Sequence, residues 1–485
     1  MILDKDLSSI QEARDMVRKA KLAYDSFAGA SGEEIDKILR AMVKTIVENA
    51  EYLARMTVEE TKYGVIEHKV IKNLFASRDV YEAIKNIKTT GILREDKENK
   101  VIEAATPVGV VLGIVPTTNP TSTIIHNTLC AVKAGNAIVF SPHPKAVKSS
   151  VATAVLLHDA AVKAGAPAGL VACLSQSTME ASDALMHHPD VSVIVATGGS
   201  AMVKAAYSAG KPALGVGPGN VPAFIERSAD IRQAVQDIMT SKTFDNGMIC
   251  ASEQAIIADA PVKEQVVAEL KRQGGYFLSP EETNKVSAIV MTPRCGMNAA
   301  WVGQTAIAIA AKAGISVPQD TKILIAPLDG YGAEYPLSHE KLTTVLAFYT
   351  VGDWEEACRL SIELLKLGGI GHTFSIHSKN DTVIREFLQK PVSRIVVNTP
   401  SALGGIGYST GLLPSLTLGC GTWGGSSLSE NLGPQHFTNI KRLAYGTKEV
   451  CLAQNAVPQK TAVSGFSSDE VAGVVRQVLK QLQLQ

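Results

Sequence analysis

The sequence predicts an α/β protein with two domains, each built on a parallel sheet that helices cover on both faces. The chain has 485 residues, which is more than one hydrophobic core normally serves. Apolar runs of strand length alternate with helical patterns between 119 and 246. A second alternation runs from Gln254 to about Asn398. Such alternation is typical of doubly wound folds.

The first part of the chain is expected to be helical and then to change to strands. Residues 7–90 carry apolar residues at helical spacing. The runs Val101–Ala105 and Val108–Val115 resemble strands, with a turn at Thr106-Pro107 between them. We therefore expect a β-hairpin over about 98–115.

The first alternation defines the elements of one sheet and its helices. Strands are expected over 137–140, 170–174, 191–196 and 221–225, and helices over 121–134, 145–164, 178–187, 200–209 and 229–243. Gly135 and Gly165 follow two of these helices, where glycine readily ends a helix. Nucleotide-binding folds are built in this way.

The second alternation defines the other sheet. Strands are expected near Ile323–Ala326, Val345–Tyr349, Thr373–Ile376 and Ile395–Val397, with a helix over Trp354–Leu367. The glycine-rich stretch 419–425 is expected to be a loop, because so many glycines cost too much entropy in a regular element.

The end of the chain is expected to be an amphipathic helix, 466–485, on a polar linker, 451–465. Ser467 and Glu470 form a capping-box pattern, and Phe466 can pack on Val471. One face carries an apolar stripe of Val471, Val474, Val475, Val478, Leu479 and Leu482. This stripe needs a groove, either on its own chain or on another protein.

Composition points to a small-molecule partner in a reducing cytoplasm. Lys plus Arg and Asp plus Glu are each 47, without blocks of like charge, so neither nucleic acid nor a membrane surface is expected as a partner. The N-terminus is too acidic for a secretory signal, and the apolar runs are too short to span a membrane. The seven cysteines are widely spaced without a CxxC pair, and the histidines lack ligand spacing, so no disulfide framework or metal site is expected.

Cys250 is the candidate nucleophile. It follows the loop residues Asn246–Ile249 and precedes a strand-like run from Ala251 to Ile257. A reactive thiolate requires a partly open and electropositive site. The alternative is a small buried hydrophobe, the commoner fate of a free cysteine. Cys295, beside Arg294, is the rival nucleophile.

Four further segments, taken together with Cys250, resemble the aldehyde dehydrogenase superfamily over residues 7–450. Pro116–Pro120 resembles the segment whose asparagine donates to the substrate oxygen, which assigns Asn119 and the Cys250 amide to an oxyanion hole. By itself, an asparagine before proline is usually a turn or a helix cap. The resemblance implies the superfamily's fold, two doubly wound domains with a β-arm for oligomerisation.

The resemblance also implies a dinucleotide site. Thr197, Gly198, Gly199 and Ser200 resemble the superfamily's glycine turn, where helix amides face a phosphate. Glu340 matches the glutamate that binds the nicotinamide ribose, although an exposed, solvated glutamate is the alternative. The expected cofactor-binding residues also include Thr117, Ser141, His143 and Gly217.

Departures from the hydrolytic members indicate the acyl acceptor. Those members carry a glutamate that activates water, and the corresponding stretch here, Leu214–Asn220, has no carboxylate. Water without a base attacks a thioester slowly, whereas a thiol with a pKa of about 8.5 is appreciably ionised near neutral pH. The acyl group is therefore expected to pass to a thiol.

Two segments resemble the CoA-acylating branch, which includes acetaldehyde and propionaldehyde dehydrogenases and the aldehyde dehydrogenase half of bifunctional alcohol dehydrogenases. They are Thr117–Ser122 and Phe140–Pro144. Ser141 stands where hydrolytic enzymes carry a ribose-binding lysine, so His143 or Lys145 is expected at the adenine end. The choice between NAD and NADP stays open.

The resemblance implies a reversible reaction of a short-chain aldehyde, CoA and NAD. The Cys250 thiolate adds to the aldehyde, Asn119 and the Cys250 amide hold the oxyanion, hydride passes to the nicotinamide, and CoA takes the acyl group. The implied domains are 1–237 for NAD binding, 238–425 for catalysis, and 426–450 for a return to the cofactor domain and an oligomerisation arm.

The resemblance further implies partners. The 98–115 hairpin and the strand-like Phe437–Tyr445 resemble dimer-forming arms, so a homodimer or homotetramer is expected. Residues 466–485 resemble the encapsulation peptides of bacterial microcompartment enzymes. Shell or core proteins are therefore expected as partners, and the microcompartment lumen as the location.

Two alternative functions stay open. One is a reductase of the same fold that acts on an acyl phosphate; it would need an Arg or Lys pair near Cys250, which Phe244–Asn246 does not offer. The other is a catalytically silent assembly scaffold, against which the intact Cys250, Asn119 and Glu340 argue.

Overall fold

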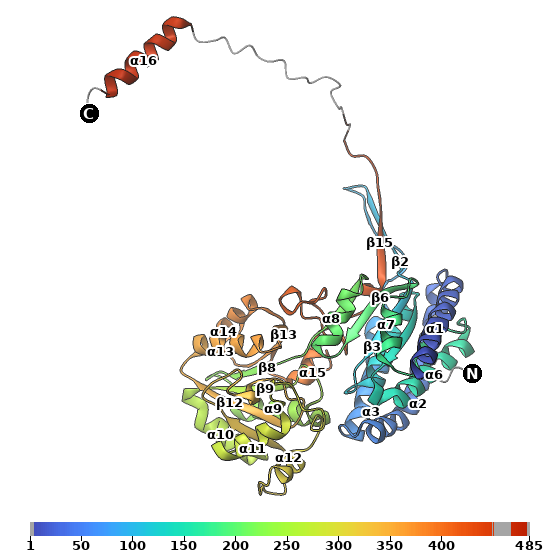
Figure 1. The fold of residues 1–485 in the computed structure, drawn as a ribbon, viewed down its shortest axis with the longest axis vertical. Coiled ribbons are helices and arrows are strands. Elements are labelled where there is room, and N and C mark those ends of the chain that lie inside the picture. The colour runs from blue at the N-terminus through green and yellow to red at the C-terminus, as the bar shows by residue number, and fades with distance from the viewer. Residues whose placement is uncertain (1–3, 449, 451–466, 483–485) are drawn as a thin grey trace. The chain divides into compact units, whose positions relative to one another are not determined.

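The computed structural model describes residues 4–448, 450 and 467–482. The chain divides into two units. The larger contains residues 1–94 and 103–441, and the smaller contains 95–102 and 442–485. Figure 1 shows that the larger unit holds two α/β domains, with the first coloured blue to green and the second green to orange.

The N-terminal helices confirm the predicted helical lead-in. They are α1 (Lys5–Phe27), α2 (Gly32–Thr61), α3 (Ile66–Leu74) and α4 (Val80–Ile84), with a π-helical turn at Phe75–Asp79. The side chain of Ser31 caps α2 in a capping box with Glu34, and α2 ends where Lys62 adopts a left-handed conformation.

The first sheet has five parallel strands in the order β5-β4-β3-β6-β7. The strands are β3 (Val110–Val115), β4 (Ala137–Pro142), β5 (Val171–Cys173), β6 (Val191–Thr197) and β7 (Ala213–Val216). The helices between them are α5 (Pro120–Lys133), α6 (Val147–Ala164), α7 (Met179–Met186) and α8 (Ser200–Ser208). This confirms the predicted alternation, with small differences at element ends.

The second sheet has seven parallel strands in the order β10-β11-β12-β9-β8-β13-β14. They are β8 (Val221–Ile225), β9 (Glu253–Asp259), β10 (Gly275–Phe277), β11 (Ile323–Pro327), β12 (Val345–Val351), β13 (Gly371–His377) and β14 (Val392–Val397). Its helices are α9 (Ile231–Thr243), α10 (Lys263–Arg272), α11 (Pro280–Val290), α12 (Ala306–Lys312), α13 (Trp354–Lys366), α14 (Asp381–Glu386) and α15 (Ser401–Gly405). One apolar core lies between the sheet and α9 with α10, and another lies between the sheet and α13 with α14.

The structure corrects one predicted domain boundary and one predicted strand pairing. The sheets divide at residues 217–220 rather than at 237, because β8 and α9 belong to the second sheet. The prediction of a hairpin over 98–115 is wrong for its second strand. Val110–Val115 is fully buried in the middle of the first sheet, where a continuous apolar run is what a central parallel strand requires.

A third sheet has the strand order β1-β2-β15. These strands are β1 (Gly91–Asp96), β2 (Val101–Pro107) and β15 (Thr438–Ala444). The strand expected at Phe437–Tyr445 is therefore confirmed, whereas β1 was not predicted because its sequence is largely polar and exposed.

The terminal helix, α16 (Ser468–Leu482), confirms the predicted capping box. The Glu470 amide donates to Ser467 Oγ over 3.3 Å, and the Ser467 amide donates to Glu470 Oε2 over 2.9 Å. Its apolar stripe is exposed, with 49–66% of each side chain accessible. Phe466, the linker 451–465 and residues 483–485 lie outside the described residues.

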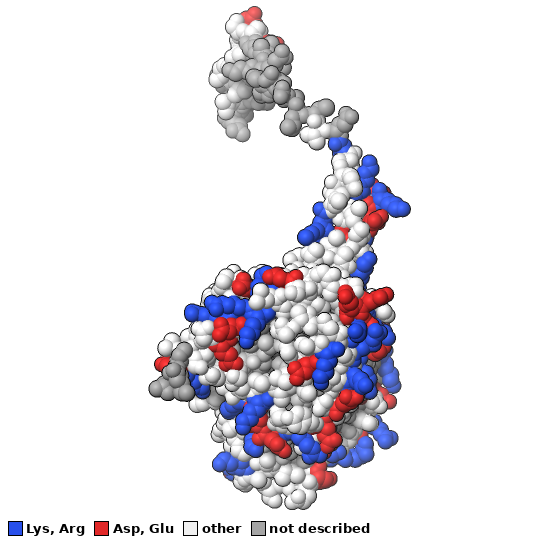
Figure 2. All heavy atoms as spheres, turned by 90° about the vertical axis from the view of Figure 1, so that its right-hand side faces the viewer, with Lys and Arg blue, Asp and Glu red and all other residues white. Residues whose placement is uncertain are grey.

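The surface charges are mixed in sign. Over the face shown in Figure 2, blue and red residues are interspersed, as is typical of a solvated face. In the described part of the chain, no helix combines the length and the apolar character that crossing a bilayer requires.

Asn136 ties three parts of the first domain together, which generates a test of the fold. Its buried Oδ1 accepts from the amides of Val108 and Gly109 over 2.8 and 2.9 Å, and its Nδ2 donates to the Phe437 carbonyl over 2.9 Å. Asn136→Ala leaves these groups without partners and is expected to reduce the free energy of unfolding by about 2–3 kcal/mol. Urea denaturation measures this, with Asn49→Ala as the control, because the Asn49 side chain makes one bond within its own helix. Equal losses in the two variants would contradict the assignment.

Candidate active site

A cavity of about 360 Å³ brings the predicted site residues together. It is lined by Thr117, Asn119, Ser141, His143, Thr197, Gly198, Gly199, Gly217, Cys250 and Glu340, among others. Ser200 begins α8, but its side chain lies outside the described residues. Residues that lie far apart in the sequence thus line one cavity in the folded chain.

The topology of the first sheet explains this convergence. From β3 the chain proceeds through β4 to β5 on one side, and β6 and β7 lie on the other side of β3. The carboxyl ends of β3 and β6 therefore diverge at a topological switch point, which is where open α/β sheets bind ligands. The loops that leave these two strands carry Thr117 and Asn119, and Thr197–Gly199.

Cys250 is held by an unusual backbone path. Asp245 and Asn246 adopt left-handed φ angles of 50° and 52°, and Gly247 follows at 80°. Opposite this loop, Gly219 lies so close that a Cβ would come within 1.9 Å of the Cys250 carbonyl oxygen. Glycine is therefore required at 219, and this residue of the stretch 214–220 lies directly against the cysteine.

The electrostatics of Cys250 differ from the expectation of an electropositive site. Cys250 as a residue is partly exposed, yet burial of its thiol, with smaller contributions from Glu340 and Cys420, raises the pKa of the thiol to about 12. Arg394 acts in the opposite direction but is outweighed. The thiol is accordingly neutral in the resting site, because desolvation disfavours the charged form.

Asn119 is oriented by a buried lysine. Its Oδ1 accepts a hydrogen bond from Lys72 Nζ over 2.7 Å, and its Nδ2 donates to the Met248 carbonyl over 3.2 Å. Lys72 and Lys69, both on α3, also bind the buried carboxylate of Asp245. This cluster was not predicted, because lysines three residues apart on a helix are usually solvated.

Glu340 is buried rather than solvated, which excludes the alternative raised for it. Its Oε1 accepts from the Gly219 amide over 2.9 Å. Burial raises the pKa of this carboxyl to about 7, against the lowering effects of the Gly219 hydrogen bond, Lys242 and Lys341. Among the described residues that line the cavity, Glu340 is the one Asp, Glu, Lys or Arg.

The other end of the cavity contains the glycine turn and the polar residues after β4. A Cβ atom added at Gly198 or Gly199 would have no heavy atom within 4 Å, so the backbone at the start of α8 is open to a phosphate. Ser141 Oγ lies 2.8 Å from Ser182 Oγ. His143 Nδ1 accepts from the Lys145 amide over 3.1 Å, and burial lowers the pKa of His143. These residues fit an uncharged ribose and adenine.

An apolar cluster lines the cavity near the cysteine and was not predicted. It consists of Tyr63, Met248, Met297, Val302 and Leu342. The five come from four distant segments and share no motif, so periodicity could not identify them.

The rival nucleophile Cys295 and several histidines lie outside this cavity. Cys295 adopts a left-handed φ of 56° and does not line it. His126 and His372 are buried, and neither lines it. His187 ends α7 as predicted, with Nδ1 3.0 Å from the Asp183 carbonyl. No group of three potential metal ligands occurs in the described ranges.

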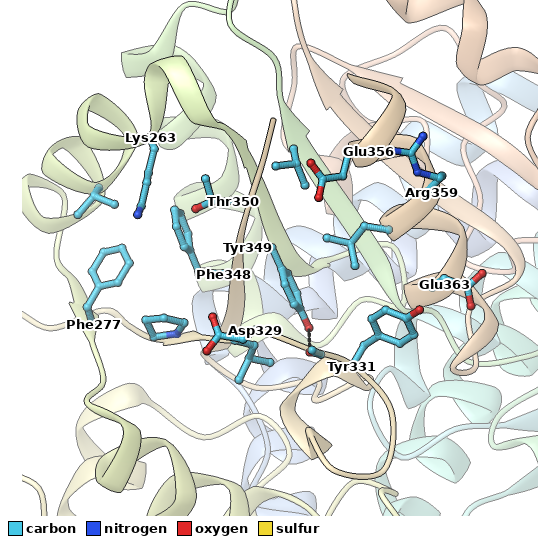
Figure 3. A pocket seen from close by; sticks show the side chains of 16 residues that line it. Lys263, Phe277, Asp329, Tyr331, Phe348, Tyr349, Thr350, Glu356, Arg359 and Glu363 are labelled. Atoms are coloured by element: carbon cyan, nitrogen blue, oxygen red, sulfur yellow. Dashed lines mark hydrogen bonds between the residues drawn. The ribbon is translucent and has the colours of Figure 1, made fainter. Parts of the chain in front are cut away.

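A larger hollow of about 680 Å³ lies in the second domain at the carboxyl ends of β11 and β12 (Figure 3). Lys263 of α10 and Arg359 of α13 border it, together with aromatic residues such as Phe348 and Tyr349. None of the predicted site residues lines it, and Cys250 lies near the opposite, amino-terminal end of the strands. We therefore place the chemistry in the smaller cavity.

Comparisons with known proteins identify related sequences. The model of the aldehyde dehydrogenase family matches residues 2–314. The bifunctional aldehyde-alcohol dehydrogenase AdhE of Escherichia coli K12 is 46% identical over 444 residues, covering 90% of this chain and 50% of that protein. The chain thus spans about half the length of this relative. The succinate-semialdehyde dehydrogenase (acetylating) of Clostridium kluyveri is 38% identical, covering 91% of this chain and 98% of that protein.

Solved structures with the same fold are also related in sequence. An acetylating aldehyde dehydrogenase from Geobacillus thermoglucosidasius has a TM-score of 0.91 and 52% identity, covering 93% of this chain and 100% of that one. A propionaldehyde dehydrogenase from a Clostridium phytofermentans fucose-utilisation microcompartment has 0.80 and 30%, covering 88% and 96%. One from Rhodopseudomonas palustris, with bound CoA and an acylated cysteine, has 0.81 and 30%, covering 89% and 97%.

The matched fold, the family model and the similarity of relatives over most of the chain lead to one conclusion. The chain belongs to the aldehyde dehydrogenase family.

Proposed function

We propose that the protein is a CoA-acylating aldehyde dehydrogenase that converts a short-chain aldehyde, CoA and NAD⁺ reversibly into acyl-CoA and NADH. One observation carries the proposal: Cys250 and Asn119 line one cavity, and the stretch 214–220 against the cysteine contains no carboxylate. The acetylating relatives, and the acylated cysteine with CoA in one solved relative, support the same reaction.

Cys250 would act as the nucleophile. After the thiol proton has passed to solvent, the sulfur forms a bond to the aldehyde carbon as the C=O π pair moves onto oxygen. The resulting oxyanion would accept hydrogen bonds from Asn119 Nδ2 and the Cys250 amide. Bound NAD⁺ would supply the hydride acceptor. Loss of hydride leaves a thioester on Cys250, and the thiolate of CoA then attacks the acyl carbon and releases the cysteine.

The acyl group would pass to CoA rather than to water because water lacks an activating base. Water needs a carboxylate in position to take its proton, and the hydrolytic position lies on the 214–220 stretch. The one carboxyl among the described lining residues is Glu340, which accepts a hydrogen bond from the Gly219 amide. We assign Glu340 to the nicotinamide ribose, where cofactor covers it.

The lining of the cavity favours NAD over NADP. Thr117, Thr197–Gly199 and Gly217 would hold the nicotinamide and phosphate end, with Ser141 and His143 at the adenosine end. No Arg or Lys is among the described lining residues, so a 2′-phosphate would find no cationic partner there. Lys145 is not among the described lining residues; its amide donates to His143 Nδ1, and its charge helps burial to lower the pKa of His143.

The same lack of cations argues against the acyl-phosphate reductase. Such an enzyme must hold a phosphate dianion beside the cysteine, which calls for charged donors in the cavity. A silent scaffold is disfavoured because a scaffold needs no cavity that joins a thiol, an amide donor and a glycine-rich turn.

The β1-β2-β15 sheet and α16 support partners for the enzyme. We infer that the sheet serves as an oligomerisation arm in a homodimer or homotetramer. The exposed apolar stripe of α16 would bind a shell or core protein of a bacterial microcompartment, and the enzyme would then lie in the lumen. A solved relative comes from such a microcompartment.

The absence of a water-activating base predicts a burst. With propanal and NAD⁺ but without CoA, the enzyme is expected to form about one NADH per active site and then nearly stop, because the acyl-enzyme accumulates. CoA restores continuous turnover. Stopped-flow absorbance of NADH measures both phases, and Cys250→Ser, which removes the nucleophile, should lose the burst. Continuous NADH formation without CoA would assign the protein to hydrolytic chemistry.

The lack of Lys and Arg among the described lining residues predicts discrimination against anionic aldehydes. Butanal and succinate semialdehyde have the same number of carbons and differ in a carboxylate. We expect a kcat/KM for succinate semialdehyde at least about 100-fold lower, because a buried carboxylate would have no cation to pair with. Initial rates with CoA and NAD⁺ measure the ratio, and similar values would show that a cation reaches the substrate.

The raised pKa of Cys250 predicts the pH dependence of its alkylation. Without cofactor, the rate with iodoacetamide should still rise between about pH 7 and about pH 10 without a plateau, because a thiol with a pKa of about 12 stays protonated over this range. Peptide mass spectrometry resolves Cys250 from the partly exposed Cys295, which serves as the internal reference. A plateau near pH 8 would mean that the thiol is not desolvated.

A further inference from the structure

We propose that Lys72 is a positioning residue of the oxyanion hole, which orients the Asn119 carboxamide and places a positive charge behind it. The inference rests on the proposed function, in which Asn119 binds the substrate oxygen. Lys72 lies on α3, outside both sheets, and it does not line the cavity.

The three hydrogens of the Lys72 ammonium have three acceptors. Nζ lies 2.7 Å from Asn119 Oδ1, 2.5 Å from Asp245 Oδ2 and 2.9 Å from the Met248 carbonyl oxygen. The side chain is 2% exposed. The ammonium group therefore contacts the Asn119 carboxamide and two residues, Asp245 and Met248, of the loop that leads to Cys250.

The contact with Asn119 determines which end of the amide faces the substrate. An ammonium has no acceptor, so it must face Oδ1 and thereby turns Nδ2 to the other side. Nδ2 donates to the Met248 carbonyl over 3.2 Å and makes a weak 3.4 Å contact with Thr118 Oγ1. The substrate oxyanion would replace the weaker contact. Without Lys72 the amide could rotate and present Oδ1, which would repel the oxyanion.

The charge of Lys72 is not needed merely to neutralise Asp245. Lys69 Nζ also binds Asp245 Oδ2, over 2.9 Å, and its other hydrogen bond goes to the Thr118 carbonyl. Two lysines and one carboxylate leave one net positive charge in a buried cluster. A charge in such a low-dielectric site polarises the Asn119 carboxamide through Oδ1 and thereby makes Nδ2 a stronger donor to the oxyanion.

The protonation of Lys72 agrees with this geometry. Burial lowers its pKa to about 8, while Asp245 opposes the shift and Lys69 adds to it. The other titratable groups near it are His68 on α3 and Cys250 on the loop. At pH 7 the ammonium form predominates, so its three donors are available.

Lys69 supplies a matched control. Lys69→Met and Lys72→Met each remove one buried charge from α3, and each leaves a neutral Lys–Asp pair behind. We expect Lys72→Met to lower kcat/KM for propanal by about 10-fold to 100-fold, mainly through kcat, because one misoriented oxyanion donor costs this much or more. Lys69→Met should lose no more than about fivefold. Equal losses in the two variants would overturn the proposal.

A double-mutant cycle with Asn119 tests the mechanism directly. Asn119→Ala removes the donor and should cost about 10²-fold to 10³-fold. If Lys72 acts through Asn119, Lys72→Met should cost less than about twofold in the Asn119→Ala background, whereas Lys69→Met should cost the same in both. A full additional loss from Lys72→Met in that background would overturn the proposal. If Lys72→Met does not fold, judged by circular dichroism, Lys72→Gln takes its place in the cycle.

The cycle separates this inference from the proposed function. The oxyanion forms when the cysteine adds to the aldehyde, before either CoA or water acts. Wild-type turnover that ignores CoA would refute the acylating assignment, yet the coupling between Lys72 and Asn119 would be measured in the same way.

Discussion

The buried cluster of Lys69, Lys72 and Asp245 is the interaction on which the site depends. Burying three charges is costly unless each is paired and its remaining donors are satisfied. Here Asp245 binds both ammonium groups and the Val65 amide, and the lysines bind carbonyl and amide oxygens. The partners belong to a helix outside both sheets, to the loop after β3 and to the loop before β9. The cluster thus joins the segment that carries Asn119 to the segment that carries Cys250, and it keeps Asp245 in its left-handed conformation.

The two sheets contribute different parts of the chemistry. The first sheet presents the carboxyl ends of β3 and β6, which diverge at a switch point and leave room for a dinucleotide along the start of α8. The second sheet presents the amino-terminal side of β9 and β12, with Cys250 before one strand and Glu340 before the other. The cavity lies between the carboxyl ends of the strands of the first sheet and the amino-terminal ends of the strands of the second. Gly219 allows the segment that connects the two sheets to pass against the cysteine.

The sequence predicted the alternation, the cysteine and the glycine turn because each has a local signal. Helical periodicity, a glycine after a helix and the order of short motifs do not depend on distant contacts. Val110–Val115 was paired with the wrong strand because an apolar run does not reveal its neighbour, and β8 was placed in the wrong domain for the same reason. Lys72 and the apolar Tyr63 cluster were missed because their roles arise only when α3 and the loops around 248 and 302 come together.

The raised pKa of Cys250 and the missing base at 214–220 belong to one design. The buried surroundings that disfavour a charged thiolate also keep water away from the sulfur. A thioester at Cys250 carries no charge, so it is not destabilised by the same burial, and it is protected from water. A thioester in such a site is released by whichever nucleophile arrives already activated. Water cannot meet that condition without a carboxylate at its side, whereas CoA carries a thiol that ionises appreciably near neutral pH. The proposed acyl transfer to CoA therefore depends on what surrounds Cys250 as much as on the cysteine itself.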